Sequence, residues 1–188
     1  IAAVGCGEDD GDLLDDTPRD GDADAGVYVL NEGLFDAGGA SLWYVDAATG
    51  EITESVFAAA NGRPLGDTAN DIALMDGKLW IVVNNSQKIE VIDAATRLSA
   101  ATIEFTGGGA PTTITFDDSG KAYVPLRGGN ALARIDTASM TQDADPLEVG
   151  DMPQEATFAD GKVYVTNSGF GAGNTVSVVD TATFTVSS

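Results

Sequence analysis

The sequence has 188 residues, of which 43% are hydrophobic, and its 30 acidic and 9 basic residues give a formal net charge of −21. This length and composition suit one globular domain. The negative charge argues against nucleic acid or an anionic membrane surface as the main partner and is easier to reconcile with a cation or a polar small molecule. Histidine is absent from the sequence, which excludes Ser-His-Asp and Cys-His catalysis and zinc motifs that need imidazole.

The N-terminus changes character at Cys6. Residues 1–5 are small and apolar, and the chain turns strongly acidic after the single cysteine, which has no partner for an intrachain disulfide. The A-V-G-C order resembles a bacterial lipobox, although Ala3 replaces the usual leucine. The resemblance implies that residues 1–5 are a signal-peptide remnant, that Cys6 is lipidated, and that Gly7 favours passage to the outer membrane. The alternative is a free cysteine in a disordered N-terminus.

Residues 6–26 form an acidic stretch with nine carboxylates and one arginine. Such a run repels itself and predicts a disordered tether between the anchor and a soluble body. Its D-x-D-x-D pattern at 20–24 is similar to a calcium loop, but Ala25 and Asn31 stand where such a loop needs glycine and glutamate. A solvated linker is therefore the preferred interpretation.

A repeat of about 43 residues organises the remainder of the chain. The words VDAATG, IDAATR, IDTASM and VDTATF place aspartates at 46, 93, 136 and 180, and a Gly-Lys turn recurs at 77, 120 and 161. The aspartates are expected to brace these turns by accepting backbone N–H bonds. A fixed period of this length indicates a repeat architecture.

Between the markers lie runs of five to seven residues rich in Val, Ile, Tyr and Trp, such as KLWIVV, KIEVID and TVSVVD. Each run predicts a strand, with about four strands per unit, and helix content should be close to nil. Four antiparallel strands per repeat are typical of a propeller blade. The sequence predicts an all-β propeller over residues 27–188, with blades at about 27–57, 58–105, 106–149 and 150–188.

Two sets of sequence motifs resemble known protein families. The tetrapeptide YVTN at 164–167, with counterparts at 28–31, 81–84 and 123–126, resembles the YVTN/YncE-type propellers. The segments VLNEGLFDAGGASL, NGRPLGDTANDI and VNNSQKIEVID are similar to bacterial NEG-start surface lipoproteins, some of which capture cobalamin. The resemblance implies a seven-bladed ring, of which this chain would be a fragment with open blade edges that can self-associate. A closed four-bladed ring is the alternative.

In a propeller, loops of successive blades converge on one face. The loops after the YVTN-like strands and the starts of the first strands supply amides, carboxylates, a guanidinium and a phenyl ring that could bind a polar ligand. For each residue, the structural alternative is that it only caps a turn. The candidate residues are Asn31, Glu32, Asn70, Asp71, Asn84, Asn85, Arg127, Gln154, Glu155, Asn167 and Phe170.

Three functions fit these patterns. The first is a non-catalytic, lipid-anchored protein of the bacterial outer membrane or cell surface that binds a small molecule, with cobalamin as candidate, or an outer-membrane protein. The second is a calcium-dependent lactonase-like or a quinoprotein-like propeller enzyme, for which the sequence offers candidate ligands of Ca²⁺ in Glu32, Asn84, Asn167 and Glu155 but no support for a quinone cofactor. The third is a scaffold that joins through its open edges. The first is preferred, with no catalytic residue, no resident metal and no nucleic-acid partner.

Overall fold

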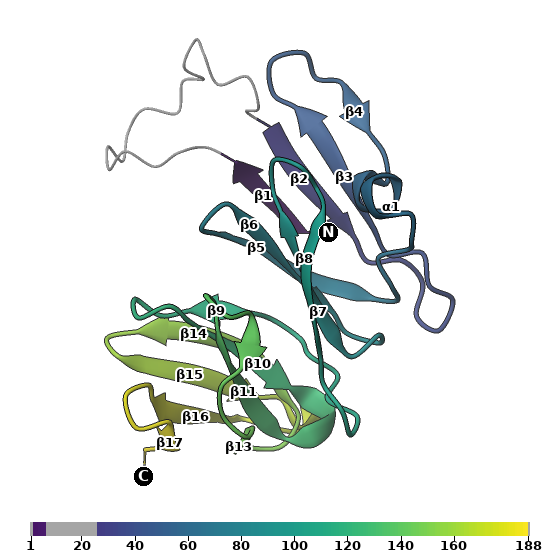
Figure 1. Ribbon diagram of the computed structural model, residues 1–188. Helices are drawn as coiled ribbons and strands as arrows, with labels where there is room; N and C mark the ends of the chain where they lie inside the picture. Colours follow the sequence, from purple (N-terminus) through teal and green to yellow (C-terminus); the bar gives the residue numbers. More distant parts are fainter. Residues whose placement is uncertain (1, 7–25, 188) are drawn as a thin grey trace.

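The computed structural model describes residues 2–6 and 26–187. The predicted tether, apart from its two ends, lies outside the described residues. Within them the chain forms four antiparallel sheets that follow one another in chain order (Figure 1). The predicted all-β fold with four-stranded antiparallel blades is confirmed. No helix among the described residues is long and apolar enough to cross a membrane.

Each sheet is one blade, and its strands lie in sequence order from the first strand to the outer edge. In the third blade the outer strand is split into β12 and β13, which both pair with β11. Blade 1 contains β1 (Ala2–Cys6), β2 (Gly26–Asn31), β3 (Ser41–Asp46) and β4 (Ile52–Thr53); blade 2 contains β5 (Ala69–Met75), β6 (Lys78–Val83), β7 (Lys88–Asp93) and β8 (Ser99–Glu104); blade 3 contains β9 (Thr115–Phe116), β10 (Lys121–Leu126), β11 (Ala131–Asp136), β12 (Thr141–Gln142) and β13 (Leu147–Glu148); blade 4 contains β14 (Pro153–Ala159), β15 (Lys162–Asn167), β16 (Thr175–Asp180) and β17 (Thr185–Val186).

Blade 1 takes its first strand from the extreme N-terminus. Strand β1 pairs antiparallel with β2 over its whole length, from Ala2 opposite Leu30 to Cys6 opposite Gly26. The segment predicted to be a signal-peptide remnant, together with Cys6, thus occupies the place of an inner strand.

One short α-helix interrupts the β pattern. Helix α1 (Val56–Asn61) joins blades 1 and 2 and ends at Gly62, whose positive φ of 65° suits glycine. Only Val56 and Phe57 of this helix are buried. Six residues are too few to show a 3.6-residue period, which explains why the sequence did not predict it. Two 3₁₀ turns, η1 (Arg127–Gly129) and η2 (Gly169–Gly171), follow the second strands of blades 3 and 4.

The four repeated aspartates brace their turns as predicted. In each turn, Oδ1 of the aspartate accepts a hydrogen bond from the backbone N–H three residues later, at 2.7–2.9 Å. These bonds hold the pKa of each aspartate below its usual value, and in Asp136 a stronger contribution comes from the Lys121 ammonium. The repeat is therefore marked by a turn that needs a carboxylate.

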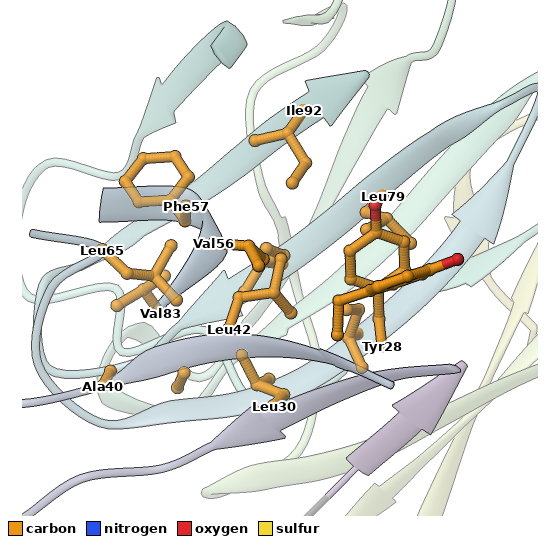
Figure 2. Packing of buried hydrophobic residues seen from close by; sticks show 14 residues of the cluster. Tyr28, Leu30, Ala40, Leu42, Val56, Phe57, Leu65, Leu79, Val83 and Ile92 are labelled. Carbon is orange, nitrogen blue, oxygen red and sulfur yellow. The ribbon is translucent and has the colours of Figure 1, made fainter. Parts of the chain in front are cut away.

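The hydrophobic core lies between blades. Three clusters of buried side chains join blades 1 and 2, blades 2 and 3, and blades 3 and 4. Figure 2 shows the first of them, in which Leu30 and Leu42 gather with Leu79 and Val83. A blade between two others must bury both of its faces, so successive residues of β6 alternate between neighbours: Leu79 packs toward blade 1 and Trp80 toward blade 3.

The central role of these interfaces gives a stability prediction. Leu132 is fully buried in the cluster between blades 3 and 4, and Leu132→Ala should lower the free energy of unfolding by about 2–5 kcal/mol because it leaves a cavity. Urea unfolding followed by circular dichroism measures the loss. Val186→Ala on the exposed β17 is the matched control and should change stability by less than about 0.5 kcal/mol. Equal effects of the two substitutions would contradict the assignment of the core.

Candidate functional site

Both predicted sets of site residues lie at the same end of the blades, which we call the loop face. The second strand of each blade ends there, and the first strand begins there: Ala69 lies opposite Val83, Pro111 opposite Leu126, and Pro153 opposite Asn167. The Gly-Lys turns lie at the other end of the same strands. The loops of successive blades are therefore presented together.

Strand pairing corrects one alignment made from the sequence. Tyr28, Trp80, Tyr123 and Tyr164 are each the third residue of the second strand in their blade. The blade 2 counterpart of YVTN is thus residues 80–83, one residue before the segment 81–84 that was aligned from the sequence. Because β6 has no polar residue at its end, the sequence alignment matched Asn84, the next residue, to the asparagine of YVTN and was wrong by one residue. Asn84 follows the strand instead of ending it.

Three side chains at one repeated position line up along the first strands. Asp71 and Glu155 are the third residues of β5 and β14, and Thr113 lies midway between them, 42 residues from each. The Ile114 N–H donates to Oδ2 of Asp71 at 2.9 Å, and the Ala156 N–H donates to Oγ1 of Thr113 at 3.3 Å. Each bond joins one blade to the next, so Asp71 has a structural role at the loop face.

Asp71 and Glu155 also influence one another electrostatically. Burial raises the pKa of Asp71, against the lowering effect of the Ile114 and Ile72 N–H groups. Burial also raises the pKa of Glu155, and the negative charge of Asp71 raises it further. Two carboxylates with raised pKa values at one place favour binding of a proton, a cation or a hydrogen-bond donor there.

Arg127 and Gln154 are a second pair that the fold brings together. Arg127 opens η1 after the second strand of blade 3, and its Nη1 donates to Oε1 of Gln154 in blade 4 at 3.4 Å. Asn70, beside Asp71, is half-buried. The loop face therefore carries a guanidinium, amides and carboxylates from blades 2, 3 and 4.

Several other predicted residues make contacts within the protein. Asn84 is buried and its amide donates to the Pro111 carbonyl at 2.7 Å, which connects blades 2 and 3. Asn85 donates to Asp36 and Asp67. Glu32 is exposed, and its backbone carbonyl accepts the Ala69 N–H. These contacts join distant segments of the chain, which is a structural role other than the turn-capping stated as the alternative.

The remaining predicted residues differ in exposure. Asn31 has a buried amide nitrogen with no hydrogen-bond partner among the described residues. The amide of Asn167 donates to Thr175 and Ser177, and its buried Oδ1 has no described partner. Phe170 is 78% exposed at the tip of η2, so it lies away from any described core.

Two features of the structure were missed by the sequence. Glu90 is fully buried in β7, where Arg63 and Lys88 pair with it at 2.7 and 2.9 Å. Burial raises its pKa, but the bonds from Arg63, Ser99 and Lys88 outweigh burial and hold the pKa below its usual value. A glutamate in an otherwise apolar run was the available signal. The cluster joins β7 to the segment before β5, and its Lys88 lies opposite Val83, where the strands reach the loop face.

The second missed feature is a groove between the last loop of blade 2 and the split outer strand of blade 3. It comprises adjoining cavities of about 570 and 440 Å³ that share Thr106, Leu126 and Pro146. Acidic side chains, Asp145 and Glu148, lie on its lining. Within the described part of the chain, no three Asp, Glu or Cys residues are grouped closely enough to hold a metal ion.

Comparison with known protein families identifies the family of this chain. A family model described as "Domain of unknown function (DUF5074)" matches residues 25–188. The chain belongs to the DUF5074 family. No curated protein sequence matches this DUF5074 chain significantly.

Solved structures similar to this DUF5074 protein include propeller-like proteins, at identities that show the fold alone. Hydrazine synthase of Kuenenia stuttgartiensis has a TM-score of 0.70 at 20% identity, over 87% of this chain and 45% of that one. Sqt1 of Saccharomyces cerevisiae has a TM-score of 0.69 at 11% identity, and the match covers 90% of this chain and 46% of Sqt1. A catalytically inactive virginiamycin B lyase of Staphylococcus aureus has a TM-score of 0.64 at 15% identity, and the match covers 88% of this chain and 52% of the lyase. The chain spans about half the length of these structures.

The carboxylate pair gives a pH prediction. Asp71→Asn keeps an oxygen that can accept the Ile114 N–H but removes the charge, so the pKa of Glu155 should fall toward its ordinary value. Because a raised folded-state pKa makes stability rise as pH falls through it, the variant should gain less stability on acidification than the parent. Carboxyl NMR titration measures the pKa. Asp76→Asn, at the other end of β5, is the control and should leave the titration of Glu155 unchanged.

Proposed function

We propose that this DUF5074 protein is a non-catalytic binding propeller whose loop face takes a polar small molecule or a partner protein. The observation that supports this best is that groups from different blades gather at the loop face: Arg127 of blade 3 bonds to Gln154 of blade 4, and the charge of Asp71 in blade 2 raises the pKa of Glu155 in blade 4. Such a set of charged and amide groups can orient a ligand that carries many hydrogen-bonding groups.

Cobalamin is the specific candidate. It rests on the resemblance of the segments around Asn31 and Asn84 to surface lipoproteins, and its peripheral amides would suit the donors and acceptors of the loop face. Exposed Phe170 would supply apolar area beside them.

The binding proposal predicts a role for Arg127. Arg127→Ala removes a guanidinium from the loop face and should weaken cobalamin binding about tenfold, or about 1.4 kcal/mol. Isothermal titration of the purified complete gene product with cyanocobalamin measures the dissociation constant. Lys78→Ala, at the opposite end of blade 2, is the charge-matched control and should bind like the parent. Absence of heat with the parent protein would reject cobalamin, and equal affinity of both variants would reject the site.

A calcium-dependent propeller enzyme is the second candidate, because a divalent cation would relieve the repulsion between Asp71 and Glu155. This function predicts that CaCl₂ raises the melting temperature of the parent but not of a Glu155→Gln variant. An unchanged melting temperature on addition of calcium and of chelator would count against it. Virginiamycin B lyase provides an enzyme with a similar fold, but its identity of 15% carries no activity to this chain.

We further propose that lipidated Cys6 anchors the protein at the bacterial outer membrane or cell surface. Processing before Cys6 would remove most of β1 and leave the edge of β2 free for another strand. Mass spectrometry of protein isolated from the membrane fraction of its native host should find an acylated Cys6 at the N-terminus, and Cys6→Ala should release the protein from that fraction. Membrane-bound protein that retains residues 1–5 and an unmodified thiol would contradict the anchor.

A further inference from the structure

The outer edge of blade 2 differs from the outer edges of the other blades. Its last strand, β8, has six residues, whereas the outer strands β4, β12, β13 and β17 have two each. Edge strands are usually kept short or carry lysine or proline, which hinders the pairing of another strand with them. The sequence SAATIE of β8 contains neither residue. Blade 2 therefore presents a long strand edge without the usual protection.

The hydrogen-bond pattern of β8 shows which of its backbone groups point outward. The Phe105 N–H, directly after β8, donates to the Gln87 carbonyl, directly before β7, at 2.8 Å. Because bonded and non-bonded pairs alternate along an antiparallel ladder, Ile103 bonds to β7 in the same way, and the N–H and C=O groups of Thr102 and Glu104 face away from it. The side chains of Thr102 and Glu104 are also exposed.

One of these outward groups already accepts a hydrogen bond from outside the blade. Nε2 of Gln142, in the outer strand of blade 3, donates to the Glu104 carbonyl at 3.4 Å. Among the described residues, the other outward backbone groups of Thr102 and Glu104 have no hydrogen-bond partner. A backbone N–H of an added strand would bond to the same carbonyl at a shorter and stronger distance than this side-chain amide.

The groove between blades 2 and 3 begins where β8 ends. Phe105 and Thr106, the two residues after β8, line its larger cavity of about 570 Å³ together with Gln142 and Asp145. Glu148 lines the adjoining cavity, and none of the described residues that line either cavity is lysine or arginine. A chain segment that lies along β8 would therefore reach a space whose charge favours a basic side chain.

We propose that β8 accepts an extended, basic polypeptide segment of a partner protein as a fifth strand of blade 2. The segment would run antiparallel to β8, as neighbouring strands do throughout the blade, and would pair with Thr102 and Glu104. A lysine or arginine near its N-terminal end would lie in the groove beside Asp145 and Glu148. Backbone pairing would supply affinity, and the carboxylates would select the basic residue. This surface contains none of the predicted site residues, so binding here is independent of the loop-face function.

A basic segment is a better occupant than the β8 strand of a second copy. Each copy has a formal net charge of −21, so two copies repel one another, whereas a basic segment is attracted. The strand itself has no basic residue. The arginine that precedes it, Arg97, is held over the Tyr44 ring with its guanidinium 4.6 Å from the ring centroid. It is therefore not free to enter the groove of another copy.

Peptide titration followed by amide NMR tests this proposal. The probe is the hexapeptide acetyl-Arg-Thr-Val-Thr-Val-Thr-amide, whose residues favour an extended strand, added to the isotope-labelled complete gene product at low ionic strength. We expect the amide signals of Thr102 and Glu104 to shift as the peptide is added. The same peptide N-methylated at every residue should cause no shift, because it has no N–H to donate. A peptide with glutamate in place of arginine should bind about tenfold more weakly.

Charge variants of the groove test the second part of the interaction. The double variant Asp145→Asn/Glu148→Gln should bind the arginine peptide about fivefold more weakly than the parent, because two exposed ion pairs are lost. Its affinity for the glutamate peptide should not fall. Glu51→Gln/Glu54→Gln, which removes the same charge from exposed positions beside β4 in blade 1, is the matched control and should bind like the parent.

Three results would overturn the proposal. The first is an absence of shifts at Thr102 and Glu104 with up to about 5 mM arginine peptide. The second is equal binding of the arginine and glutamate peptides by the parent. The third is a shift of the same two signals with protein concentration alone, which would identify a second copy as the occupant.

Discussion

The structure depends on one constraint: a blade that lies between two others must bury both of its faces. Trp80 and Val82 of β6 pack toward blade 3, while Leu79, Ile81 and Val83 pack toward blade 1. The strand is therefore apolar throughout, and the core is a series of interfaces, because no blade has an interior of its own. Hydrogen bonds also join neighbouring blades, in both directions: the Ile114 N–H of blade 3 donates back to Asp71 of blade 2, and the Asn84 amide of blade 2 donates forward to the Pro111 carbonyl.

This arrangement is the reason why we propose binding at the loop face. The second and third strands of the blades are committed to packing, so polar side chains gather in the connections and at the starts of the first strands, such as Asp71 in β5 and Glu155 in β14. There, residues that hold blades together and residues that could hold a ligand are neighbours: Asp71 accepts a bond from the next blade and also raises the pKa of Glu155. The Arg127 guanidinium, in contrast, has one described hydrogen bond, to Gln154 at 3.4 Å, which leaves it more available to a ligand.

The sequence predicted the period, the strands and the aspartate turns because each has a local signal, such as the carboxylate that Asp93 aims at the Thr96 N–H. It did not predict α1, which is too short to show a helical period. It also misaligned β6 with the YVTN strand by one residue, because β6 ends in Val83 where β15 ends in Asn167. The buried Glu90 was hidden because its partner Arg63 is 27 residues away. Likewise, the bond from Asn84 to Pro111 shows that an amide expected at a ligand site can serve the fold.

The most direct test of the account is hydrogen exchange at the Ile114 amide, whose acceptor lies in the preceding blade. Its N–H precedes β9 and bonds to the Asp71 carboxylate, so its protection reports the inter-blade contact and not a strand pairing within the blade. The account predicts slow exchange at Ile114 that becomes fast in an Asp71→Ala variant, while amides within β10 stay protected. Fast exchange at Ile114 in the parent protein, with β10 protected, would show that blades do not dock through their first strands.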